Sequence, residues 1–207
     1  YATIISQAVS GILCLVVIIR KFEILHLKKS DWQLDGTYVK VLLNMGLPMG
    51  FQYSITAIGS VILQASVNTL GSVAVAAMTA ASKISMFVVC PFDALGSTMA
   101  TYGGQNVGAG KLNRLSKGIW TAGMLGTIYS LVILGVLMLW GQYLVYLFVS
   151  ADEVVVIEQA RQFLITNAAF YIPLVYVNVV RFMIQGMGFS GFAVFAGVFE
   201  MAARTLV

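Results

Sequence analysis

Long stretches without a charged residue constrain the fold of this chain more than any other feature of its sequence. They cover residues 1–19, 41–82, 118–151, 162–180 and 182–199. Only 10% of the residues are charged, whereas soluble domains contain about 25%. Because about 20 apolar residues in a helix span a hydrocarbon core about 30 Å thick, we expect these stretches to cross a membrane. The longest must cross it twice, with a turn at 68–72.

The pattern of uncharged stretches predicts an all-α, polytopic membrane helical bundle with six transmembrane helices. The expected spans are 1–19, 46–68, 74–103, 115–140, 154–183 and 189–207. Membrane-spanning strands alternate over only about ten residues, and these stretches are much longer.

The distribution of Lys and Arg gives an expected orientation. The first connection contains Arg20, Lys21, Lys28, Lys29 and Lys40, and the third contains Lys111, Arg114 and Lys117. The second connection is uncharged, and the fourth contains Asp152, Glu153 and Glu158. Because positive charge resists translocation, we expect the first and third connections to be cytoplasmic and the other two to lie outside. This alternation agrees with six spans.

Several functional classes do not fit the sequence. The basic residues lie between apolar stretches, so the net charge of +4 favours a membrane protein over a nucleic-acid-binding one. His26 has no second ligand near it, and Cys14 and Cys90 lie in separate apolar spans, where we expect both to be buried. We find no catalytic constellation and no metal cluster.

The glycine-rich string GGQNVGAGK at 103–111 is the most distinctive segment. A phosphate-binding loop would need Gly at position 105 and Ser or Thr after the Lys, but the chain has Gln105 and Leu112. We expect these glycines to allow close backbone approach and to break the helix, with Gln105 and Asn106 bonding the carbonyls freed at its end.

Two segments in this region resemble the end of helix 8 and the following cytoplasmic turn of multidrug and toxic compound extrusion (MATE) transporters. They are PFDALG at 91–96 and GQNVGAGK at 104–111, which matches the family's GQN-x-GAGK string. Weaker resemblances follow in family order, with GLP at 46–48 similar to the start of helix 7, LGSVAVAA at 70–77 to the outer turn into helix 8, and QGMG at 185–188 to the turn between helices 10 and 11.

The resemblance implies a twelve-helix protein with two six-helix lobes around a central cavity. Residues 1–19 would be the last helix of the N-terminal lobe, 20–45 the cytoplasmic inter-lobe linker, and 46–207 helices 7 to 11 of a truncated C-terminal lobe. The chain would then be a fragment. The implied partners are a small drug-like substrate, the lipid bilayer and the N-terminal lobe of the same protein, in the cell inner (plasma) membrane. The resemblance implies no cofactor beyond a coupling proton or sodium ion.

Polar side chains inside the spans are the candidates for a cavity, because a charge at the bilayer centre costs about 2.5–3.5 kcal/mol and must face protein or water. They recur at helical spacing on three spans. The candidates are Gln52, Thr56, Gln64, Lys83, Asp93, Asn167, Tyr171, Asn178 and Arg181. Such rows could line one wet cavity, or they could be hydrogen bonds between helices.

Two acids within spans need separate consideration. Glu200 and Arg204 are four residues apart in the order that favours an ion pair, which leaves a structural pair and a role in coupling both open. Asp93 is a hypothetical proton-binding group. The NorM-like branch of the family carries an acid on helix 7 and another on helix 10, but 46–68 and 162–185 of this chain contain none. The sequence is therefore more similar to the DinF-like branch, whose coupling acid lies on helix 1 of the other lobe.

These observations predict a cation-coupled antiporter that exports cationic or amphipathic drugs and toxic compounds by alternating access, and not an enzyme. The alternatives are a lipid-linked oligosaccharide flippase of the same superfamily and a non-transporting membrane scaffold.

Overall fold

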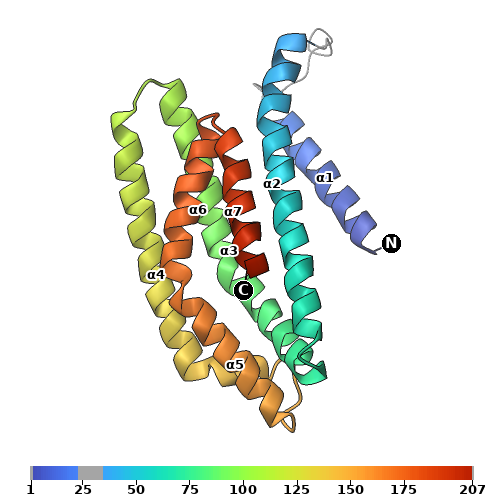
Figure 1. Cartoon of the computed structure of the whole chain (residues 1–207). Coiled ribbons are helices and arrows are strands. Elements are labelled where there is room, and N and C mark those ends of the chain that lie inside the picture. The colour runs from blue at the N-terminus through green and yellow to red at the C-terminus, as the bar shows by residue number, and fades with distance from the viewer. Residues whose placement is uncertain (1, 23–34, 207) are drawn as a thin grey trace. The chain divides into compact units, whose positions relative to one another are not determined.

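The computed structural model describes residues 2–22 and 35–206, and in these residues all regular secondary structure is helical (Figure 1). Two compact units divide the chain, one covering Tyr1–Val41 and the other Leu42–Val207. The helices are α1 (Ala2–Lys21), α2 (Gly36–Asn68), α3 (Ser72–Gly108), α4 (Asn113–Val145), α5 (Val154–Ala169), α6 (Tyr171–Gly186) and α7 (Gly191–Leu206).

The helices confirm the all-α class and follow the order of the predicted spans. Helices α1 to α4 are each long and apolar enough to cross a membrane. The α5–α6 pair, bent by 52°, qualifies as a fifth span when it is counted as one. With α7 at the sixth predicted position, the chain has the organisation of a multi-pass membrane protein.

The fifth predicted span is broken at Phe170, which sequence analysis did not anticipate. Pro173 is the third residue of α6. Proline lacks the N–H that would bond the carbonyl four residues earlier, and its ring crowds that carbonyl. In the first turn of a new helix neither defect is costly. The chain therefore ends α5 at Ala169 and starts α6 two residues later.

Helix α2 begins ten residues before the predicted span at 46, within the stretch expected to be linker. The carboxylate of Asp35 accepts a hydrogen bond from the backbone N–H of Thr37 at 2.8 Å, which satisfies a donor at the helix start. Residues 23–34 of the expected linker, including His26, lie outside the described residues, and Arg20 and Lys21 belong to the end of α1.

In the second unit, α3 and α6 pack along each other, α4 packs against both, and α5 packs against α3 and α4 (Figure 1). The largest fully buried side chains come from all four helices, with Phe92 on α3, Leu137 on α4, Leu164 on α5 and Met183 on α6. The core is thus shared by helices that are distant in sequence, and it holds the polar faces of α3 and α6 close together.

The α3–α6 crossing depends on small residues. A Cβ atom on Gly104 would lie 2.9 Å from the Gly186 carbonyl oxygen, and a Cβ on Gly186 would overlap the backbone of Ala100. The expected close approach is therefore present. The third span was expected to end at 103, but α3 continues to Gly108, and the Asn106 side chain donates to the Tyr102 carbonyl at 2.8 Å within the helix.

The string after Gly108 terminates α3 by a Schellman motif. The N–H of Lys111 bonds the carbonyl of Asn106 at 2.8 Å and that of Gly110 bonds Val107 at 3.0 Å. Gly110 has a φ of +68°, which glycine adopts without strain. The same pair of bonds around Gly188 ends α6. Figure 1 places these two turns at one end of the second unit and the α2–α3 and α4–α5 connections at the other.

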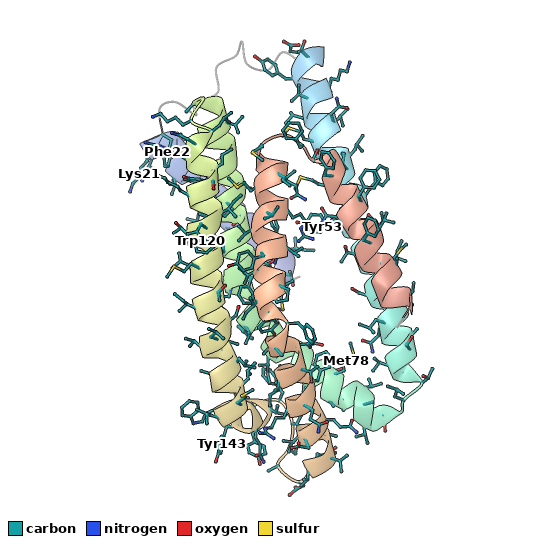
Figure 2. All side chains as sticks on the ribbon, turned by 60° about the vertical axis from the view of Figure 1, so that its left-hand side comes forward. Lys21, Phe22, Tyr53, Met78, Trp120 and Tyr143 are labelled. Carbon is teal, nitrogen blue, oxygen red and sulfur yellow. The ribbon has the colours of Figure 1, made fainter. Side chains whose placement is uncertain are left out.

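The outer face of α4 is apolar and unpacked. Trp120 and Tyr143 are 71% and 65% exposed, and Figure 2 shows both pointing outward from the helix. Such a surface suits lipid and is unfavourable in water. Cys14 and Cys90 are also exposed, so their expected burial is wrong. A thiol behaves as a small hydrophobe, and lipid solvates it as well as a protein core does.

Candidate functional site

A cavity of about 520 Å³ lies among α3, the α5–α6 junction, α6 and α7. Its size falls in the range of about 300–1,000 Å³ that small-molecule sites occupy. Most of its lining is apolar. The lining residues are Val89, Asp93, Phe170, Pro173, Leu174, Val177, Asn178, Arg181 and Ala196.

Three predicted site residues supply the polar part of this cavity. Asp93 comes from α3, and Asn178 and Arg181 come from α6. The Arg181 guanidinium donates to the Asn178 side-chain oxygen at 2.8 Å, and it lies 5.3 Å from the centre of the Phe182 ring. Asn178 is buried and Arg181 is half-buried, so these contacts fix the position of the positive charge.

The local sequence explains this wall. Leu174, Asn178 and Arg181 follow one another at steps of four and three, which places them on one face of α6. The break at Phe170 sets where this face begins, and Phe170 and Pro173 themselves line the cavity. Sequence analysis missed the contribution of Phe170 and Pro173. Pro173 was the feature of the sequence that could have predicted the break and this part of the wall.

A second cavity of about 450 Å³ adjoins the first and shares Val177, Arg181 and Ala196 with it. Tyr176 and Phe192 add aromatic surface to its lining. Arg181 therefore lies in the walls of both cavities.

Gln52 on α2 is not among the residues that line the 520 Å³ cavity. It is 4% exposed, and its side-chain oxygen accepts a hydrogen bond from the amide nitrogen of buried Gln185 on α6 at 2.9 Å. Gly197 on α7 packs over the same residue, since a Cβ there would lie 3.1 Å from the Gln52 Cγ. This pair is a contact between helices, one of the two interpretations left open by the sequence.

The other candidates on α2 and α3 are also separate from the 520 Å³ cavity. Gln64 donates to the Asn68 side chain at 3.1 Å within α2, and Thr56 is half-buried. Lys83 lines a different cavity of about 390 Å³ together with Ser150 and Glu153 at the α4–α5 connection. The three polar rows thus do not converge on one cavity in this structure.

Tyr171 is 4% exposed and belongs to a buried aromatic cluster. The Phe92 ring meets the rings of Tyr129 and Tyr171 edge-on, at centre distances of 5.2 and 5.4 Å. The Tyr129 hydroxyl donates to the Val88 carbonyl at 3.0 Å. Asn167 is half-buried on the other side of the helix break. This cluster joins α3, α4 and α6 next to the cavity.

Two predicted site residues cannot be placed. The side chains of Glu200 and Arg204 lie outside the described part of α7, so the expected ion pair stays a prediction. Within the described residues, no group of three or more His, Cys, Asp or Glu side chains could hold a metal ion.

Comparison with known proteins shows to which family this architecture belongs. The MatE family profile matches residues 48–207. The probable multidrug resistance protein YpnP of Bacillus subtilis (strain 168) is 28% identical over 185 residues, which are 87% of this chain and 39% of the relative. The probable multidrug resistance protein YoeA of the same organism is 28% identical over 147 residues, which are 64% of this chain and 30% of that relative.

A solved structure described as MATE in complex with MaL6 shares the fold, with a TM-score of 0.87 and 21% identity over 96% of this chain and 45% of that one. The chain thus spans less than half the length of these relatives. Because the family profile covers well over half of the chain, the chain belongs to the MatE family, whose members are transporters and not enzymes.

Proposed function

We propose that this chain is part of a cation-coupled antiporter that exports cationic or amphipathic drugs and toxic compounds across the cell inner membrane by alternating access. Family membership and the names of both Bacillus relatives support multidrug efflux. The observation that carries the proposal is the cavity with Asp93, Asn178 and Arg181 in its wall. Charged groups are kept within membrane spans at a cost, and they mark substrate or ion pathways.

The chain works together with a second lobe in this proposal. The structural relative covers nearly all of this chain but is more than twice as long, which supports a partner bundle elsewhere in the same protein. Alternating access then consists of the two bundles rocking about a site between them.

The coupling ion is a proton or a sodium ion, and its main acid lies in the second lobe, as in the DinF-like branch. Residues 46–68 and 162–185 carry no Asp or Glu, so α2 and α6 cannot supply one. Asp93 on α3 is the acid in the wall of the cavity, and it is the candidate for an additional proton-binding group in this lobe.

The test is dye efflux from proteoliposomes that contain the full-length gene product, under separate proton and sodium gradients. We expect efflux under at least one gradient and none without either. Asp93→Asn should reduce proton-driven efflux, whereas Asp152→Asn, a change of an exposed acid in the α4–α5 connection, should leave it unchanged. Efflux that ignores both gradients contradicts antiport, and transport of lipid-linked glycans instead of dyes identifies a flippase.

A further inference from the structure

A groove of about 350 Å³ lies between α3 and α4, close to the connection that joins them. It shares no lining residue with the 520 Å³ cavity. Leu95 lines the groove and Asp93 lines the cavity, and residues two positions apart in an α-helix are about 200° apart around its axis. The groove and the cavity are therefore separate and lie on opposite sides of α3.

Apolar side chains form most of the groove. Leu95 and Met99 come from α3, and Ala122 and Leu125 come from α4. On α4 the lining extends from Lys117 to Leu125, which is about 12 Å at the helical rise. Leu125 is 57% exposed, so the groove opens onto the outer face of α4. Because this face suits lipid, the groove offers an apolar track for a hydrocarbon chain.

A positive charge lies at the end of the groove next to the α3–α4 connection. Lys117 is the one charged residue in the lining, and its side chain is exposed. Lys111 and Arg114 precede it in the sequence, and no Asp or Glu occurs between residues 94 and 151. This end of the groove therefore attracts an anion.

The Lys117 ammonium is the donor that the groove offers to such an anion. The hydroxyls in the lining already donate to backbone carbonyls, at 2.8 Å from Thr98, 2.9 Å from Thr121 and 3.0 Å from Tyr102. Gly118 lets the Tyr102 ring lie against α4, because a Cβ atom there would overlap the ring. An ammonium group has three N–H donors and binds phosphate as a point charge.

The depth of Lys117 in the membrane fits a lipid headgroup. Trp120, about one turn further along α4, is exposed and points outward from the helix (Figure 2). Tryptophan is enriched where the hydrocarbon core meets the headgroups, so Lys117 lies at headgroup level. The basic residues predict that this end of the bundle faces the cytoplasm, and the cytoplasmic leaflet carries anionic lipids.

We propose that the groove between α3 and α4 binds an anionic phospholipid, with the phosphate at the Lys117 ammonium and an acyl chain along the apolar side chains. The positive charge selects an anionic lipid over a zwitterionic one, because no carboxylate in the lining pairs with a choline or ethanolamine group. The apolar track selects a lipid over free phosphate. The site does not depend on which compound the 520 Å³ cavity carries.

Native mass spectrometry of the full-length protein in detergent measures this binding. Phosphatidylglycerol is compared with phosphatidylcholine that has identical acyl chains. We expect phosphatidylglycerol to bind about fivefold more tightly, which is the order of effect of one Lys near an anionic lipid surface. Glycerol phosphate, which carries the anionic group without a chain, should not displace it at equal concentration.

Two pairs of variants assign the charge and the apolar track. Lys117→Gln should remove the preference for phosphatidylglycerol, whereas Lys111→Gln, at an exposed position outside the lining, should keep most of it. Thr98→Phe fills the groove and should weaken binding of both lipids. Thr101→Phe, at another exposed position of α3 outside the lining, should leave their binding unchanged.

Equal binding of the two lipids to the wild type overturns the inference, and this comparison does not require any variant to fold. Equal losses in Lys117→Gln and Lys111→Gln also overturn it, because the attraction would then be diffuse and not seated in the groove. Displacement of the lipid by glycerol phosphate would mean that the site binds phosphate alone, which contradicts the proposal. Lipid binding is measured without an ion gradient, so its failure is separate from a failure of the efflux assay.

Discussion

Single hydroxyl groups in the aromatic cluster give the sharpest residue-scale prediction. The Tyr129 hydroxyl bonds the Val88 carbonyl at 3.0 Å. The buried hydroxyls of Tyr171 and Ser85 lie beside each other, but their contact does not meet full hydrogen-bond geometry. Tyr129→Phe should therefore lower the free energy of unfolding by roughly 0.6–1 kcal/mol. Tyr171→Phe should change it less, because the Tyr171 hydroxyl makes only a loose contact with the Ser85 hydroxyl.

Unfolding of the full-length protein by SDS in mixed micelles measures both changes. The two variants remove the same atom from rings that contact the same Phe92, so each controls for the other. A larger loss for Tyr171→Phe than for Tyr129→Phe would show that the Tyr171 hydroxyl is bonded in the membrane.

At this scale, the sequence predicted polar side chains that share one helix face, but not which of these faces meet. The spacing of Asn178 and Arg181 placed both on one face of a helix, and they do line the same cavity. Extending that row back to Asn167 assumed an unbroken helix, and the break at Phe170 interrupts it. Gln52 fitted a similar periodic pattern on α2. Its buried hydrogen bond to Gln185 depends on how α2 lies against α6, however, and the spacing of residues within one helix does not predict that.

At the scale of elements, the α3–α6 crossing should tolerate no side chain at Gly186. A Cβ atom there overlaps the Ala100 backbone, which cannot move without displacing α3. Gly186→Ala should destabilise the protein by about 1–3 kcal/mol or more, or abolish folding. Gly135→Ala is the matched control, since a Cβ at Gly135 has nothing within 4 Å and alanine is the better helix former.

The yield of monodisperse full-length protein and its SDS unfolding compare the two alanine variants. Wild-type behaviour of Gly186→Ala would mean that α3 and α6 are further apart in the membrane.

The GQN-x-GAGK string has a physical role in this crossing, because its first glycine lies against Gly186 and its last glycine ends α3. The glycines that make this string resemble the family therefore also stabilise the fold.

The helix break shows a limit of hydropathy as a guide to elements. Residues 154–183 are uniformly apolar enough to predict one span, and the bent pair does qualify as one. Hydropathy is insensitive to a missing N–H, however, so it could not reveal that Pro173 ends the first half. The break matters functionally because it brings Phe170 and Pro173 into the cavity wall.

At the scale of the whole molecule, the sequence predicted that successive connections lie at opposite ends of the bundle, because two independent features of the sequence indicate it. Uncharged length sets the number of crossings, and Lys and Arg set the side of each loop. The structure places the α3–α4 turn and the α4–α5 connection at opposite ends of the second unit, as the alternation requires (Figure 1). The side of the membrane that each end faces stays a prediction from the positions of Lys and Arg.

Labelling of single cysteines tests that orientation. Ser116 and Ser150 are both exposed, and they lie in the third and fourth connections or beside them. In a full-length protein with Cys14 and Cys90 replaced by Ala, we expect Ser150→Cys to react with a membrane-impermeant maleimide on intact cells. Ser116→Cys, which lies between Arg114 and Lys117, should react only after permeabilisation. The reverse pattern would mean that the third connection lies outside and the fourth in the cytoplasm. Labelling of both sites in intact cells would mean that α4 does not span the membrane.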